Sequence, residues 1–151
     1  MIEHLEKNAL WIIMDPWEKT PYEEDLIKCP ELDTINHRLF ERIAEYVPKL
    51  NRVFVSCSLI SKVHPSLSNV KNLFHNFDLL RDYVLRNNIT DIVYMGLHHG
   101  RCILNRPTGA MYVNKELPNV KLWLKTDLVE ILPWDDVVVA DSNSKQFMTF
   151  I

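Results

Sequence analysis

Residues 9–14 (Ala-Leu-Trp-Ile-Ile-Met) form an unbroken apolar run that ends in Asp15-Pro16. A run without polar alternation is typical of a strand buried on both faces, as in a parallel sheet. Such a sheet is covered by helices on both sides, so this run already points to an α/β protein. The chain has 151 residues, of which 47% are hydrophobic. We therefore expect a single domain, residues 1–151, with a substantial core.

Helical and strand patterns alternate along the rest of the chain, and the segments 16–33 and 58–68 are expected to be loops. The expected strands are 9–14, 53–57, 91–95, 120–124 and 137–140, and the expected helices are 34–47, 70–86 and 101–113. This order predicts a doubly wound, Rossmann-like fold of three layers. Its mainly parallel sheet should have about five to six strands, with right-handed crossovers.

Charge and cysteine content exclude several classes of protein. The formal net charge is −3 and the pI is near 6.1, so no electrostatic footprint indicates nucleic acid or an anionic membrane surface as a partner. No apolar run is long enough to span a bilayer. Three cysteines that lie far apart, Cys29, Cys57 and Cys102, argue against a disulfide framework and for a reducing compartment. We expect a cytoplasmic protein.

Candidate functional residues lie where the predicted strands end. Ligands of doubly wound sheets bind outside the carboxyl ends of the strands, which directs attention to Asp15, Cys57 and the segment 96–102. The chain has only three glycines, Gly96, Gly100 and Gly109, and all of them lie within fourteen residues. This segment is therefore the part of the chain that we expect to need unusual backbone angles.

Cys102 is predicted to lie in the first turn of a helix that follows a glycine-containing turn. Free backbone N–H groups and the helix dipole favour the thiolate there, and they could also stabilise an oxyanion. His98, His99 and Arg101 would add positive potential. The alternative is that Cys102 is a small buried apolar residue without a chemical role.

Asp15 is a candidate general base or acid at the end of the first strand. The alternative is a turn or cap, because Asp-Pro is a common turn pair. The run from His98 to Arg101 also favours an anion pocket for a phosphate or carboxylate. Adjacent histidines without an Asp-x-His pair do not predict a metal site, and no phosphate-loop or dinucleotide motif predicts a cofactor.

Three segments resemble the isochorismatase-like cysteine hydrolases, over about residues 8–127. The first strand ends in Asp15, the helix beginning Asp78-Leu79-Leu80-Arg81 falls where that family has one, and the strand 92–95 runs into Gly96. Cys102 follows six residues after Gly96, and the apolar Ile103 comes next, in the order and spacing of that family.

This resemblance implies a trio of Cys102 as nucleophile, Asp15 as proton acceptor and a lysine that stabilises charge. Lys71 is nearest to the expected lysine position and Lys62 is the other choice, although both could equally be solvated surface residues. The segment that contacts substrate or oxyanion would comprise Leu97, His98, His99 and Arg101. Relatives often have a cis peptide in this segment, which makes the Leu97-His98 bond a candidate. They also commonly form homo-oligomers.

Two functions remain open at this point. One is a cysteine hydrolase that acts on a small amide or related substrate, without metal or cofactor. The other is a catalytically inactive domain that binds a small anion or a protein partner, favoured by Pro16-Trp17 after Asp15 and by the bulky residues after Gly96. The acidic segment 16–33 could serve as a lid or oligomer contact, with Trp17 and Tyr22 as its anchors.

Overall fold

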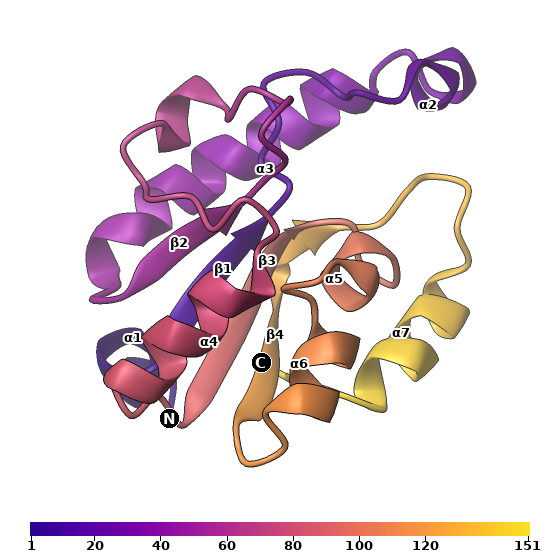
Figure 1. Ribbon diagram of the computed structural model, residues 1–151. Coiled ribbons are helices and arrows are strands. Elements are labelled where there is room, and N and C mark those ends of the chain that lie inside the picture. Colours follow the sequence, from indigo (N-terminus) through magenta and orange to yellow (C-terminus); the bar gives the residue numbers. More distant parts are fainter.

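The computed structural model describes residues 1–151 and contains one sheet of five parallel strands in the order β2-β1-β3-β4-β5 (Figure 1). Its strands are β1 (Leu10–Met14), β2 (Val53–Ser56), β3 (Asp91–Leu97), β4 (Lys121–Glu130) and β5 (Thr149–Phe150). The chain runs outward from β1 to β2 and then returns past β1 to β3. The reversal places a topological switch point between β1 and β3, where sheets of this class bind ligands.

Helices cover both faces of this sheet. They are α1 (Ile2–Asn8), α2 (Glu23–Lys28), α3 (Leu32–Tyr46), α4 (Phe77–Arg86), α5 (Cys102–Asn105), α6 (Ala110–Glu116) and α7 (Val137–Lys145), with single 3₁₀ turns at Val47–Lys49 and Pro65–Leu67. Figure 1 shows α3 on one side of the sheet and α4, α5 and α6 on the other. The predicted α/β fold with a parallel sheet of five strands is therefore confirmed.

Strand β1 explains why its sequence lacks polar alternation. Trp11 and Ile13 pack into the core cluster that includes α3, while Leu10, Ile12 and Met14 pack into the cluster beneath α4, α5 and α6. All five side chains are fully buried. Alternate residues of a strand point to opposite faces, so a central strand with a helix layer on each side needs apolar residues at every position.

The predicted strand 137–140 is wrong, because these residues begin helix α7. Asp136 caps this helix, and its side chain accepts hydrogen bonds from the backbone N–H groups of Val138 (2.8 Å) and Val139 (3.3 Å). The valines that suggested a buried strand are more than half exposed. The last strand is instead β5, which pairs with β4 through only two residues.

The predicted helix 70–86 is correct only from Phe77 onward. Residues 71–73 lie extended along β2, where Val55 donates to the Lys71 carbonyl and accepts from the Leu73 N–H, both at 2.9 Å. Phe74 and His75 then adopt positive φ angles of 52° and 55°. Asn76 caps α4 by accepting from the N–H of Leu79.

Three further segments differ from the expectation in detail. The predicted helix 101–113 is split into α5 and α6 around Pro107, which lacks the N–H that a continuous helix needs. The predicted loop 16–33 contains α2, and the chain begins with α1.

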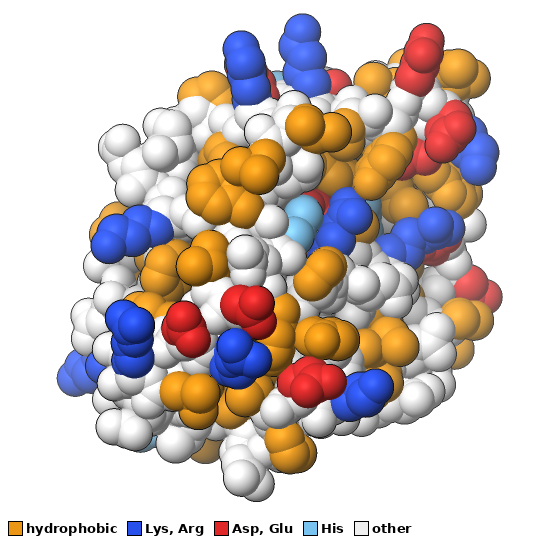
Figure 2. All heavy atoms as spheres, in the orientation of Figure 1, with side chains coloured by type: hydrophobic (Ala, Val, Ile, Leu, Met, Phe, Trp, Pro, Cys, Tyr) orange, Lys and Arg blue, Asp and Glu red, His pale blue; other side chains and the backbone are white.

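None of the helices combines the length and the apolar character that crossing a bilayer requires. Figure 2 shows basic and acidic side chains interspersed on the face that carries α4, α5 and α6.

Candidate active site

The carboxyl ends of β1 and β3 bring Asp15 and the 96–102 segment to the same edge of the sheet. Met14 pairs with Gly96 across the two strands. Gly96 has φ +101°, and a Cβ at this position would lie 2.3 Å from the Met14 carbonyl oxygen. Only glycine allows this approach, because every other residue would collide with the backbone of β1. Gly100, also with positive φ, then turns the chain into α5.

Asp15 is completely buried and has a φ of 50°, directly after β1. The Nε of Arg106 donates to its Oδ2 at 2.9 Å, and the Nε2 of His75 lies 2.8 Å from its Oδ1. A carboxylate without solvent needs such partners, because an unpaired buried charge is strongly destabilising. The environment of Asp15 is therefore that of a buried, compensated charge.

His75 connects Asp15 to a buried chain of hydroxyl groups. Its Nδ1 lies 3.0 Å from the Ser56 hydroxyl, which lies 2.7 Å from the Thr108 hydroxyl. A carboxylate only accepts hydrogen bonds, so we assign the Nε2 proton to the side that faces Asp15. Neither Nε2 nor Oδ1 has a hydrogen bond to any other group in the chain.

The Cys102 thiol opens α5 and faces Asp15. Burial, followed by the Asp15 charge, raises the pKa of this thiol to about 12, although Arg106 and the His98 backbone N–H act in the opposite direction. The thiol is therefore protonated at neutral pH. The expectation of a resting thiolate is wrong, because desolvation and a facing carboxylate outweigh the four-residue helix and the nearby cation.

Two backbone N–H groups beside the sulfur have no carbonyl partner. The N–H groups of Cys102 and His98 are absent from the backbone hydrogen bonds of the chain, while the neighbouring His99 and Arg101 both donate to carbonyl groups. The peptide bond between Leu97 and His98 is cis. N–H groups that have no carbonyl partner and lie next to a nucleophile are suited to stabilise an oxyanion.

The two predicted histidines have separate environments. His98 is 2% exposed, and burial lowers its pKa to about 4, so it is neutral rather than cationic at neutral pH. His99 points toward α7, where its Nε2 lies 2.6 Å from Asp141. Of the two, only His98 lines the cavity above Cys102. The expectation that both would add positive potential at the sulfur is wrong for His98.

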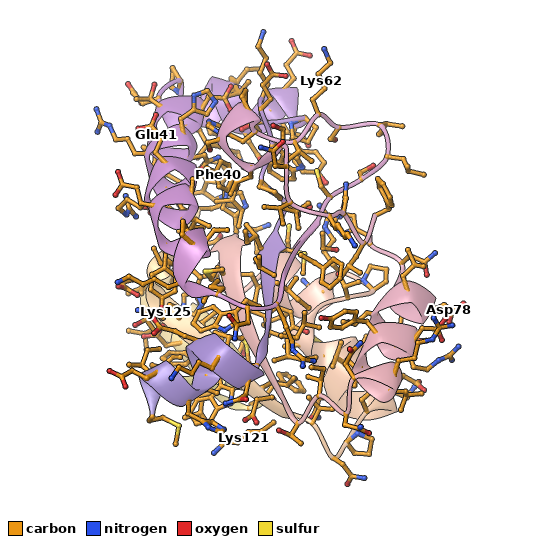
Figure 3. The ribbon with its side chains drawn as sticks, turned by 90° about the vertical axis from the view of Figure 1, so that its left-hand side faces the viewer. Phe40, Glu41, Lys62, Asp78, Lys121 and Lys125 are labelled. Carbon is orange, nitrogen blue, oxygen red and sulfur yellow. The ribbon has the colours of Figure 1, made fainter.

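Neither candidate lysine is brought into this cluster. Lys71 lies in the segment along β2, and its side chain is exposed. Lys62 is also exposed, and Figure 3 shows it projecting outward from the end of the molecule. The cation beside Asp15 is instead Arg106.

A cavity of about 360 Å³ lies above the Cys102 thiol. Its lining residues come from α2, α5 and the segments that follow β3 and β4: Tyr22, Glu24, Asp25, His98, Arg101, Cys102, Asn105, Arg106 and Leu132. Figure 1 shows α2 and the segment between β4 and α7 extending beyond the carboxyl ends of the strands. Lys28 of α2 stacks on Trp134 of that segment, with its Nζ 4.9 Å from the ring centre.

Arg106 and His75 are the two residues that sequence reasoning missed. Arg106 lies four residues after Cys102, which is the spacing of neighbours on one helix face, so the sequence did contain a signal for it. His75 had no comparable signal, because its segment was interpreted as helical. Tyr22, a predicted anchor, contacts the site through its hydroxyl, which accepts from Arg106 at 3.1 Å. Trp17, the other predicted anchor, is buried in the core.

The side chains of His, Cys, Asp and Glu form no group of three or more that could hold a metal ion. The groups that the structure brings together at the cavity edge are a thiol, a buried carboxylate and a guanidinium. Together they provide a nucleophile, a proton acceptor and a charge that stabilises the carboxylate.

Comparison with known proteins supports the fold. No family model and no curated protein sequence matches the chain. Among solved structures, the chain is similar to an isochorismatase-like hydrolase from Alkaliphilus metalliredigens, with a TM-score of 0.63 and 13% identity. The match covers 95% of this chain and 94% of that chain. The chain therefore has the fold of an isochorismatase-like hydrolase, as its sequence motifs predicted.

Proposed function

We propose that this protein is a cysteine hydrolase that cleaves a small amide, with Cys102 as nucleophile and Asp15 as proton acceptor. The observation that carries the proposal is the position of the Cys102 thiol, which lies in the wall of a cavity and faces the fully buried Asp15 carboxylate. A base within direct reach can remove the thiol proton during attack, so a resting thiolate is not required. The fold shared with an isochorismatase-like hydrolase supports the same class of reaction.

In the first half of the reaction, the thiol proton passes to Asp15 while the sulfur attacks the carbonyl carbon and forms an S–C bond. The backbone N–H groups of Cys102 and His98 stabilise the oxyanion of the tetrahedral intermediate. The C–N bond then breaks, the amine leaves with the proton from Asp15, and a thioester remains. In the second half, water attacks the thioester carbonyl carbon while Asp15 accepts a proton from the water. The C–S bond then breaks, the carboxylic acid leaves, and Asp15 returns the proton to the Cys102 sulfur, which restores the thiol.

Arg106 has the cationic role that the family resemblance assigns to a lysine. Burial opposes its charge, but the adjacent Asp15 carboxylate and the Tyr22 hydroxyl raise its pKa above the ordinary value, so it stays protonated. A guanidinium that donates to Asp15 orients the carboxylate toward the sulfur. Lys71 and Lys62 then have no part in the reaction.

The test is a panel of small primary and secondary amides incubated with the purified protein, with amine release as the readout and mass spectrometry of the Cys102 peptide to trap a thioester. We expect turnover in the wild type and in Cys29→Ser, which removes a thiol outside the cavity, and none in Cys102→Ser. Turnover that persists in Cys102→Ser contradicts the proposal.

The second candidate is a binding domain without turnover. It is favoured by two observations: the Cys102 thiol is protonated at rest, and the Asp15 carboxylate is already paired with Arg106. The same panel distinguishes the two candidates. A binding domain should show amides that raise the melting temperature, with neither amine release nor a thioester on Cys102.

A further inference from the structure

The cavity above Cys102 is lined by both cations and acids, and only the cations are held in ion pairs with other side chains. The cavity volume, about 360 Å³, is at the low end for small-molecule sites. A ligand of this size contacts most of the wall at once, so the unpaired charges of the wall select its substituents. The chemistry of these groups is informative because the substrate must also present a carbonyl to Cys102.

Both cations in the wall are already paired with carboxylates. Arg101 binds Asp135 through two hydrogen bonds, from Nε at 2.6 Å and from Nη2 at 2.7 Å. Arg106 donates from Nε to Asp15 at 2.9 Å and from Nη2 to the Tyr22 hydroxyl at 3.1 Å. A carboxylate ligand would have to compete with a protein carboxylate for either guanidinium.

The acidic groups of the wall form no direct ion pair, although the Asp25 charge contributes to the raised pKa of Arg101. Glu24 and Asp25, in the first turn of α2, form no ion pair and no side-chain hydrogen bond, and both line the cavity. Negative charges are favoured at the N-terminus of a helix, where the helix dipole is positive. Because no side chain binds the carboxylates of Glu24 and Asp25, their oxygen atoms remain available to a ligand. Lys28, at the other end of α2, lies over Trp134 and does not line the cavity.

His98 adds an uncharged polar group to the wall of the cavity. His98 is 2% exposed, lines the cavity, and its Nε2 has no hydrogen-bond partner in the chain. Since His98 is uncharged at neutral pH, it adds no attraction for anions. An unpartnered buried polar atom in the wall of a cavity indicates a place for a polar ligand atom.

We propose that the cavity selects a small amide with a positively charged substituent, such as an ammonium or amidinium group directed toward Glu24 and Asp25, and discriminates against carboxylates. This inference rests on the proposed hydrolase function, because the amide carbonyl has to reach Cys102. It replaces the expectation of an anion pocket. That expectation counted the basic residues of the 98–101 segment without the burial that keeps His98 neutral and without the carboxylate that pairs with Arg101.

The test uses the reactivity of Cys102 toward two charged thiol reagents of similar size, aminoethyl methanethiosulfonate, a cation, and sulfonatoethyl methanethiosulfonate, an anion. In both reactions the thiolate attacks the divalent sulfur of the reagent. The bond between that sulfur and the sulfonyl group breaks, which gives a mixed disulfide and releases methanesulfinate. Rates at Cys102 are measured by peptide mass spectrometry in a Cys29→Ser background and divided by the rates with a free small thiol. Both reagents depend equally on the thiolate fraction, so the ratio reports the charge of the cavity.

We expect a normalised preference for the cation of roughly three- to tenfold, which falls as ionic strength rises. The double variant Glu24→Gln/Asp25→Asn should lose this preference. Glu23→Gln is the matched control, because Glu23 is an exposed acid of the same helix that does not line the cavity. It should retain the preference of the background protein.

A normalised ratio at or below one overturns the inference but leaves the hydrolase proposal intact. A cation preference that persists in Glu24→Gln/Asp25→Asn also overturns it. If neither reagent modifies Cys102 in the folded protein while both modify it after unfolding, the thiol is not accessible from the cavity, and both the inference and the proposed function fail.

Discussion

Replacing Asp15 by Asn should make Cys102 more reactive toward alkylating reagents while it abolishes hydrolysis. The Asp15 charge is the second cause, after burial, of the raised pKa of the Cys102 thiol. Asn preserves the shape of the side chain and tolerates the positive φ of 50° at this position better than most residues. The substitution therefore removes one negative charge from the site with little strain on the backbone.

The magnitude follows from the charges around the sulfur. A unit charge about 4 Å away contributes about 4 kcal/mol at an effective dielectric constant of about 20, which corresponds to about three pKa units. Arg106 neutralises part of the Asp15 charge, so we expect the pKa of the thiol to fall from about 12 by about one to two units. Each unit by which the pKa falls raises the thiolate fraction about tenfold, but a thiolate of lower pKa is also a weaker nucleophile. The two effects together leave an increase in alkylation rate of about three- to tenfold.

The assay is the rate of iodoacetamide alkylation of the Cys102 peptide between neutral and alkaline pH, with Cys29 in the same sample as an internal reference. Asp78→Asn is the matched control, because Asp78 is an exposed residue on the outer side of α4 (Figure 3). It should leave the Cys102 rate unchanged. An equal or lower rate in Asp15→Asn, with the melting temperature preserved, would refute the electrostatic reasoning.

Two further predictions concern stability. Arg106→Met leaves the buried Asp15 with only His75 as its partner, and we expect the free energy of unfolding in urea to fall by about 3 kcal/mol. The double variant Asp15→Asn/Arg106→Met should lose less than Arg106→Met alone; an additive loss would contradict this. Burial lowers the pKa of His98 from 6.5 to about 4, so between these pH values the unfolded chain binds a proton that the native protein does not. Stability should therefore fall as pH drops through this window, by up to about 3 kcal/mol. His98→Gln should reduce this dependence, whereas His4→Gln, at an exposed position of α1, should not; equal slopes would count against the assignment.

The layout of the sheet could be predicted because its signals are local. The apolar run that became β1 had to be buried on both faces, and the patterns of β2 and β3 led to the correct parallel arrangement. The spacing from Gly96 to Cys102 also placed the thiol at the carboxyl end of β3. Each of these inferences depends on a few adjacent residues and on general rules for parallel sheets.

The errors occurred where a helix cap or a long-range contact decided the conformation against the preference of the residues themselves. Val137 to Val139 have strong strand propensity, yet the cap from Asp136 starts a helix there and leaves these valines exposed. Residues 71–73 form backbone hydrogen bonds with Val55, more than fifteen positions earlier in the chain, so they are extended in spite of their apolar periodicity. The first is a local capping interaction and the second is a tertiary contact, and both override the intrinsic preference of the residues.

The electrostatics of the site could not be predicted for a related reason. A histidine or cysteine has an ordinary pKa in the absence of burial, and sequence alone does not show how much solvent a group loses on folding. His98 is neutral and the Cys102 thiol is protonated because both are desolvated and face particular charges.

By itself, the sequence determined that the chain forms a parallel α/β sheet and that Asp15 and Cys102 lie at one edge of it. These features depend on hydrophobic periodicity, turn residues and strand ends, which are properties of neighbouring residues. Only the tertiary structure decided that Arg106 and His75 hold Asp15, that the lysines stay outside, and that Glu24 and Asp25 line the cavity. Those outcomes depend on contacts between residues far apart in the chain and on how deeply each side chain is buried. Both are set only when the core packs.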